Sequence, residues 1–210
     1  MIILSHRGFW IQPGEKNDRT AFIRSFENDF GVETDIRDYA EKIFISHDMS
    51  RGNEMTIEDF FELYNSYSRS LPLALNVKAD GLFRSMAALL QKSKIDEYFF
   101  FDMSLPDALG YLKEGLNFFS RQSEYEKEPY LYKEADGIWL DEFHQHWINE
   151  AIIQQHITEK KKICIVSPEL HKRNYKEEWE HYKYITYKFG FENLMLCTDY
   201  PGEAKTFFNS

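Results

Sequence analysis

The sequence predicts an α/β protein with the fold of a compact (β/α)8 barrel, without an insertion domain, in which residues 1–210 form one domain. Short apolar runs of strand length alternate with amphipathic stretches of helical length, which is typical of parallel strands joined by crossover helices. Eight such pairs fill 210 residues, close to the lower size limit of this fold. Most apolar runs end in polar or ionisable residues, which would converge on one mouth of a barrel. An open, doubly wound sheet is the alternative, and it would place a site at the same strand ends.

The predicted strands are apolar runs of four to six residues, rich in β-branched and aromatic side chains. They cover residues 2–5, 32–37, 73–78, 98–102, 116–121, 137–141, 163–167 and 194–199. The predicted helices have apolar residues at three- and four-residue spacing and cover 18–29, 56–67, 81–94, 105–114, 127–135, 145–159, 174–187 and 201–208. After the second strand, residues 38–48 predict a turn and a short returning strand, which together form an extended hairpin.

The second predicted helix shows how local sequence defines an element. Thr56 stands at a capping position and Asp59 follows three residues later, a pattern typical of a helix start. The apolar residues that share one face of this helix are Ile57, Phe60, Phe61 and Tyr64. We therefore expect the helix to pack on the sheet.

Composition and charge narrow the class of protein. The chain has 25 basic and 35 acidic residues, a formal net charge of -10, so its average surface repels phosphate backbones and we expect no nucleic-acid partner. Cys164 and Cys197 lie inside apolar runs, which indicates reduced thiols in the core. No uncharged run approaches the ~18 residues of a membrane span, and the apolar start is too short for a signal sequence, so we expect a cytoplasmic protein without stable membrane insertion. The oligomeric state is open.

Acidic side chains at the end of the second predicted strand suggest a cation site. Glu33, Asp35 and Arg37 alternate along the strand, so all three point to one face. Two carboxylates so close repel each other unless a hard cation lies between them, and oxygen ligands suit Mg²⁺ or Ca²⁺. An ion pair with Arg37 is the competing interpretation. Asn76 and Lys78 end the next predicted strand.

Two of the histidines are candidates for acid–base chemistry. His6 and His47 each follow an apolar run and precede a charged residue, so each could present an imidazole at the mouth. A structural role is the alternative for both. The other histidines have weaker claims: a pair with metal-site spacing but no third nitrogen ligand (His144 and His146), one residue near the rim (His171), and two in helical patterns (His156 and His181).

Together these segments resemble the glycerophosphodiester phosphodiesterase family. The matching motifs are a His-Arg-Gly turn at 5–8, an Asn-containing stretch before the first helix at 15–22, a Glu-x-Asp strand at 31–35 and a His-Asp pair at 46–48. Their order and separations agree over the first fifty residues. Residues 73–78 and 196–201 match the later strands of the family more loosely.

The resemblance implies a metal-dependent phosphodiester hydrolase that acts on a small or membrane-derived phosphodiester. By position, His6 and His47 would be the acid–base pair. Arg7 and Lys78 would contact the phosphate. The implied ligands of a divalent Mg²⁺ or Ca²⁺ ion are Glu33, Asp35, Asn76 and Glu15. This chemistry is coherent, because a cation and basic side chains offset charge on the phosphate while an imidazolium protonates the leaving alkoxide.

The sequence departs from the family pattern in three places. Asn76 stands where the family has a third carboxylate ligand, so the site has one charge fewer. Alignment through Asn17 puts Lys16 in the place of a family glutamate, with Glu15 one residue away. Only residues 49–55 separate the His-Asp pair from the next helix, where the family usually inserts a small domain. The changes at Asn76 and around Glu15 leave an inactive phosphoester-binding barrel as one alternative. The same barrel chemistry leaves a second, a phospholipase-like enzyme that forms a cyclic phosphate.

Overall fold

A computed structural model describes residues 1–68, 70–190 and 194–209. The chain divides into two compact units. The N-terminal unit is Ser5–Phe118, and the C-terminal unit is Met1–Leu4 with Phe119–Ser210. The first strand, β1 (Ile2–His6), begins in the C-terminal unit and ends in the N-terminal unit. Within the described residues, no helix is long and apolar enough to cross a membrane.

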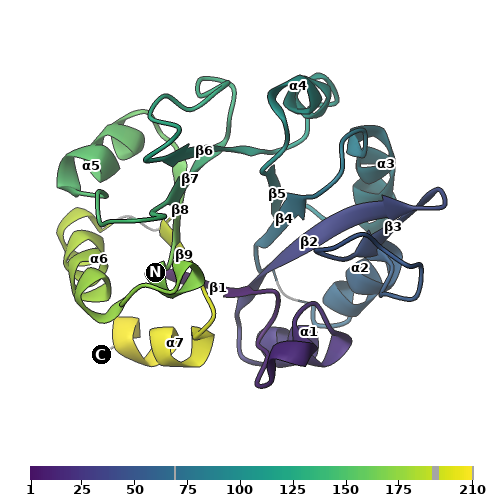
Figure 1. Ribbon diagram of the computed structural model, residues 1–210, viewed down its shortest axis with the longest axis horizontal. Helices are drawn as coiled ribbons and strands as arrows, with labels where there is room; N and C mark the ends of the chain where they lie inside the picture. The colour runs from purple at the N-terminus through teal and green to yellow at the C-terminus, as the bar shows by residue number, and fades with distance from the viewer. Residues whose placement is uncertain (69, 191–193, 210) are drawn as a thin grey trace. The chain divides into compact units, whose positions relative to one another are not determined.

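The N-terminal unit contains parallel strands that alternate with helices. Its further elements are η1 (Pro13–Glu15), α1 (Arg19–Glu27), β2 (Gly31–Tyr39), β3 (Lys42–Ile45), α2 (Ile57–Asn65), β4 (Leu73–Val77), α3 (Phe83–Ser93), β5 (Tyr98–Phe101) and α4 (Leu105–Lys113). The strands β5, β4 and β2 are neighbours in this order and run parallel, whereas β3 pairs antiparallel with β2. The predicted hairpin after the second strand is therefore confirmed. Figure 1 shows α1, α2 and α3 on one side of these strands.

Aromatic side chains fill the space between α1 and α2. Phe22 and Phe26 of α1 pack against Phe60, and Phe26 also meets the ring of Tyr64 edge to face. The hydroxyl of Thr56 accepts a hydrogen bond from the Asp59 N–H and begins α2, as predicted. The four apolar residues of the predicted face are buried, which confirms that this helix packs inward: Ile57, Phe60, Phe61 and Tyr64.

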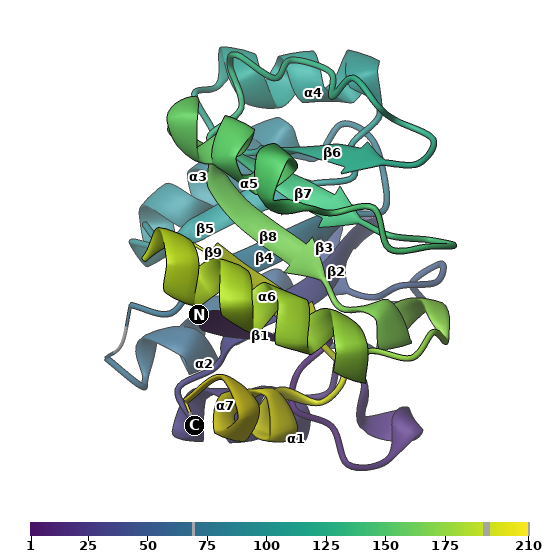
Figure 2. The same cartoon turned by 90° about the vertical axis from the view of Figure 1, so that its left-hand side faces the viewer.

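The C-terminal unit continues the alternation. Its elements are β6 (Phe119–Ser123), β7 (Gly137–Asp141), α5 (Glu150–Thr158), β8 (Lys162–Val166), η2 (Pro168–His171), α6 (Lys176–Phe189), β9 (Leu194–Thr198) and α7 (Pro201–Asn209). The strands β6, β7, β8 and β9 pair in parallel in this order. Figure 2 shows α5 and α6 lying across β7 and β8. Cys164 and Cys197 are buried thiols that take part in no disulfide, as predicted.

Two predicted elements of the C-terminal unit are corrected. Residues 127–135, all described, form turns rather than the predicted helix. Pro129 explains this in part, because it has no N–H and disfavours helical backbone at the preceding residue. Local contacts replace the helix, such as the hydrogen bond that Ser120 Oγ donates to the Tyr130 carbonyl at 2.5 Å.

The helix predicted at 145–159 begins five residues later, because N–H groups of three intervening residues donate to side chains outside the helix. Gln145 N–H donates to Glu124, and the N–H groups of Trp147 and Ile148 donate to Glu142. Asn149 then caps α5 by accepting from two backbone N–H groups.

Candidate active site

A sharp turn after β1 presents His6 and Arg7 beside β2. Arg7 (φ 59°) and Gly8 (φ 84°) both adopt left-handed backbone, and a Cβ at Gly8 would lie 2.8 Å from Cβ of Ala21. The Arg7 N–H donates to the backbone carbonyl of Glu33 at 2.8 Å and to its Oε2 at 3.2 Å. The turn is thus tied to the strand that carries the predicted carboxylates.

The two carboxylates of β2 are buried and lie among basic side chains. Asp35 Oδ2 is 3.0 Å from Arg7 Nε and accepts a hydrogen bond from Asn17 Nδ2 at 2.9 Å. Asp35 Oδ1 is 3.4 Å from Lys78 Nζ. The ion-pair partners of Asp35 are therefore Arg7 and Lys78, rather than the Arg37 that spacing suggested. The structure brings these predicted site residues, at or just after the ends of β1, β2 and β4, together within the N-terminal unit.

Glu33 lies at the centre of this group. Its Oε2 is 3.9 Å from His6 Nε2, and its Oε1 accepts a hydrogen bond from Asn76 Nδ2 at 3.4 Å. Burial, and after it the negative charge of Asp35, raise the pKa of Glu33 to about 7 against the opposing effect of nearby cations. Holding both carboxylates ionised here is costly without a further cation.

The oxygen atoms around Glu33 fit a hard divalent cation. Asp35 and Asn76 are register neighbours on β2 and β4, so their side chains share one face of the sheet. Asn76 Oδ1 and Asp35 Oδ1 are buried, and neither accepts a hydrogen bond. Buried polar atoms are rarely left without a hydrogen-bond partner. Carboxylate and amide oxygens are the ligands that Mg²⁺ and Ca²⁺ prefer.

Glu15, the remaining predicted metal ligand, forms an ion pair with Arg24 instead of joining Glu33 and Asp35 in the proposed cation site. Its Oε2 is 2.7 Å from Arg24 Nη1 and its Oε1 is 3.1 Å from Nη2. Its Oε2 also accepts a hydrogen bond from the Ile11 N–H at 2.7 Å. The hydrogen bonds from Arg24 and from the Ile11 and Gln12 N–H groups lower the pKa of Glu15 to about 2.

Asn17 lies beside Asp35, although the sequence analysis gave it no role in the site. Its amide donates to Asp35, and its Oδ1 accepts a hydrogen bond from Thr34 Oγ1 at 2.8 Å. Left-handed backbone at Asn17 (φ 61°) lets the side chain turn back toward β2. The sequence feature that could have indicated this role is that Asn17 aligns with the asparagine of the family motif.

His47 follows the hairpin strand β3 and is the more open of the two predicted histidines. Its Nδ1 is 2.9 Å from Asp48 Oδ1, and its side chain is 48% exposed, against 16% for His6. The hydrogen bond with His47 lowers the pKa of Asp48. His47 and Arg7 line one cavity of about 680 Å³ in the N-terminal unit.

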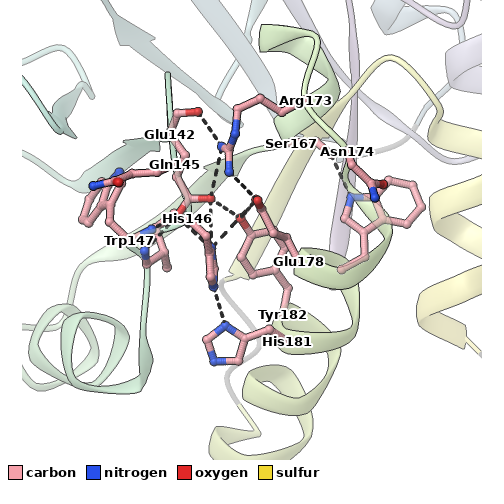
Figure 3. A network of polar contacts seen from close by, with 12 residues as sticks. Glu142, Gln145, His146, Trp147, Ser167, Arg173, Asn174, Glu178, His181 and Tyr182 are labelled. Atoms are coloured by element: carbon pink, nitrogen blue, oxygen red, sulfur yellow. Dashed lines mark hydrogen bonds and ion pairs between the residues drawn. The ribbon is translucent and has the colours of Figure 1, made fainter.

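A separate polar network lies in the C-terminal unit, at the end of β7 (Figure 3). Glu142, His146 and Glu178 bring potential metal-ligating atoms within 4.8 Å of one another. The sequence paired His146 with His144 and did not connect it to α6. Arg173 forms ion pairs with both carboxylates and so supplies a cation from the chain itself. We interpret this network as structural.

The pKa values of the two acids in this network shift in opposite directions. Burial raises the pKa of Glu142, but hydrogen bonds from His146 and from two backbone N–H groups outweigh it and lower the pKa to about 2. Burial and the adjacent Glu142 raise the pKa of Glu178 to about 7. Glu142 is therefore the permanent carboxylate, and Glu178 holds a proton part of the time near neutral pH.

We expect Glu142→Gln to lower the free energy of unfolding at pH 7 by about 3–5 kcal/mol, because it removes the buried negative charge beside Arg173 and replaces one accepting oxygen with an amide donor that faces the Tyr182 hydroxyl. Glu178→Gln is the matched control and should cost less than about 1 kcal/mol, since an amide resembles the protonated acid. Urea unfolding of the full chain measures both values. Equal losses would contradict the assignment of the charge to Glu142.

Comparisons with known proteins identify the fold. No family model matches the chain, and no curated protein matches it. It is similar to a glycerophosphodiester phosphodiesterase from Agrobacterium tumefaciens, with 14% identity over 100% of both chains and a TM-score of 0.73. A glycerophosphoryl diester phosphodiesterase from Parabacteroides distasonis has 14% identity over 99% of this chain and 86% of the other, with a TM-score of 0.70. A Ca²⁺-dependent phosphatidylinositol-specific phospholipase C from Streptomyces antibioticus has 9% identity over 99% and 95%, with a TM-score of 0.58.

These likenesses show the class of fold to which the chain belongs, an α/β (β/α)8 barrel, as the sequence predicted. More particularly, the chain is a barrel like those of the glycerophosphodiester phosphodiesterases, matched over its full length.

Proposed function

We propose that this protein is a metal-dependent phosphodiester hydrolase whose active site lies at the ends of β1, β2 and β4 in the N-terminal unit. The observation that carries the proposal is the pair of buried carboxylates, Glu33 and Asp35, beside the unsatisfied amide oxygen of Asn76. Arg7 and Lys78 border the same group. Acidic oxygens for a cation and basic groups for a phosphate are the two requirements of phosphodiester hydrolysis.

Charge stabilisation is the first part of the proposed mechanism. The guanidinium of Arg7 and the ammonium of Lys78 would bind the phosphate oxygens and offset the charge that grows on them. Glu33, Asp35 and Asn76 would hold Mg²⁺ or Ca²⁺, which when bound withdraws charge from the phosphate. Asn17 fixes the Asp35 side chain through its hydrogen bond.

Proton transfer is the second part, and we assign it to the two histidines. The carboxylate of Asp48 lies 2.9 Å from His47 Nδ1 and orients the imidazole, and we assign the protonation of the leaving alkoxide to His47. His6 would then take the proton of the attacking water. Retained turnover without either imidazole would contradict this assignment.

Product analysis by ³¹P NMR tests the proposed reaction. Wild-type protein with Mg²⁺ or Ca²⁺ should convert a glycerophosphodiester into a phosphomonoester and a free alcohol. A cyclic phosphate that accumulates before the monoester would instead support the phospholipase-like alternative. Binding of the phosphodiester without any turnover would support the inactive, phosphoester-binding alternative.

Asn76 should limit the affinity of the cation site. We expect Asn76→Glu to tighten Mg²⁺ or Ca²⁺ binding by about tenfold, because hard cations respond to the charge of their ligands. Glu15→Ala should leave the affinity within about twofold, because that carboxylate is turned to Arg24. Calorimetric titration of the metal-stripped protein measures both. Weaker binding by Asn76→Glu would show that a third carboxylate does not fit, and weaker binding by Glu15→Ala would restore Glu15 as a ligand.

A further inference from the structure

Two arginines beside the proposed active site have no part in the mechanism above. Arg37 near the end of β2 and Arg51 after β3 line a cavity of about 750 Å³ in the N-terminal unit. Lys78 and His47 line the same cavity. Whatever these arginines bind would therefore lie next to the proposed phosphate-binding and proton-transfer groups.

The charge of Arg37 is poorly balanced by its surroundings. Arg37 follows Asp35 by two residues and so points to the same face of β2. Its Nε is buried and has no hydrogen-bond partner. The acid that interacts with it electrostatically is Asp48, whose side chain is 95% exposed and already contacts His47. Solvent screens the charge of so exposed a carboxylate.

Arg51 is held in place by its backbone while its side chain stays available. Glu54 accepts hydrogen bonds from the N–H groups of Arg51 and Gly52, both at 3.0 Å, and from Ser50 Oγ at 2.7 Å. The bond from Ser50 and these N–H donors outweigh the effect of burial and lower the pKa of Glu54 to about 2. Among the described residues, the Arg51 guanidinium has no ion pair, so the short loop presents an uncompensated cation.

The number of cations exceeds what a single phosphodiester needs. Arg7 and Lys78 already contact the buried Asp35, and they suffice for the one negative charge of a diester. Arg37 and Arg51 add two positive charges to the cavity, against the single exposed carboxylate of Asp48 in its lining, although the whole chain has a net charge of -10. A guanidinium binds carboxylate and phosphate with two parallel hydrogen bonds, which makes such a pair a specific anion site.

We infer that the substrate has a second anionic group, a phosphomonoester or a carboxylate, on one of the alcohols of the phosphodiester, and that Arg37 and Arg51 bind it. This inference rests on the proposed function for the place of the phosphodiester itself. Because Lys78 and His47 line the same cavity, both anionic groups belong to one ligand molecule.

Matched substrates test the inference by turnover. Glycerophosphoglycerol and its derivative with a terminal phosphomonoester differ only in the second anion. A phosphodiester that joins glycerol to a hydroxyl group of glycerate has a free carboxylate instead. Wild-type protein should prefer the better of the two charged substrates by about tenfold or more in kcat/KM, since a charge-assisted bond contributes about this factor. Arg37→Gln and Arg51→Gln should each reduce that preference by roughly tenfold.

Arg84→Gln is the control, because Arg84 is a 76% exposed residue of α3 in the same unit and is 3.7 Å from Glu114. It should leave the preference unchanged. Equal activity of the wild type on charged and neutral substrates would overturn the inference, as would Arg37 and Arg51 variants that behave like the Arg84 variant. If Arg37→Gln does not fold, the substrate preference of Arg51→Gln tests the inference, because Arg51 is exposed.

A binding measurement separates this inference from the proposed function. Calorimetry compares propane-1,3-diyl bisphosphate with propyl phosphate, neither of which requires turnover. Tighter binding of the bisphosphate that is lost in Arg37→Gln and Arg51→Gln would support the second anion site even if the protein hydrolysed no diester. Equal affinity for both ligands in the wild type would overturn it even if hydrolysis were observed.

Discussion

Replacing His6 or His47 with alanine should lower kcat on a glycerophosphodiester by about 10²–10⁴-fold, the usual effect of losing a general acid or base. Both variants should fold, because neither side chain belongs to the core. His6 lies 3.9 Å from Glu33, and the contact of His47 is with the exposed Asp48. Turnover measured at saturating substrate and cation isolates kcat from binding.

The control for these variants is His144→Ala, an exposed histidine of the C-terminal unit that hydrogen-bonds Tyr125. It should keep the turnover of the wild type. Near wild-type kcat in both the His6 and His47 variants would refute the two-histidine mechanism. Loss of the cooperative unfolding transition in either variant would instead assign that histidine a structural role.

Removal of divalent ions with EDTA should abolish hydrolysis, and Mg²⁺, Mn²⁺ or Ca²⁺ should restore it. The reason is electrostatic, since Glu33 and Asp35 are buried together and an incoming phosphodiester adds a third negative group. The same ions should raise the thermal midpoint of the protein, because a ligand at 100 times its Kd stabilises the folded state by about 2.7 kcal/mol. Full activity in exhaustively chelated protein would contradict metal dependence.

The sequence predicted side-chain positions best where they depend only on the geometry of a strand. Alternation along β2 was enough to place Glu33 and Asp35 on one face, and the order of parallel strands placed Asn76 and Lys78 next to them. The start of α2 was equally predictable, because the Thr56 cap and the apolar face depend on local spacing.

Loop residues near the site were not predictable, because their positions depend on partners from other elements. Glu15 and Asn17 are two residues apart, and either could have approached the β2 carboxylates. Arg24 of α1 binds Glu15, and left-handed backbone at Asn17 directs its amide to Asp35. The spacing of residues in the sequence predicts neither the ion pair of Glu15 nor the direction of the Asn17 side chain.

The network around Glu142 was missed for a related reason. Its members come from the end of β7, the start of the next loop and α6, so no short motif unites them. His146 was compared with His144, its neighbour in sequence, although its contacts are Glu142 and, at 2.8 Å between ring nitrogens, His181 of α6. The predicted helix at 127–135 failed where Pro129 and side-chain contacts outweighed apolar periodicity.

Calorimetric titration of metal-stripped protein with Mg²⁺ or Ca²⁺, followed by an activity assay of the same samples, tests directly whether Glu33 and Asp35 hold a catalytic cation. Wild-type protein should bind a single ion per chain, and Glu33→Gln and Asp35→Asn should each weaken binding by about tenfold or more and lose turnover in parallel. Glu114→Gln, a matched acid at the end of α4, should change neither property. Undiminished ion binding in the Glu33→Gln, Asp35→Asn double variant would show that these carboxylates do not form the cation site.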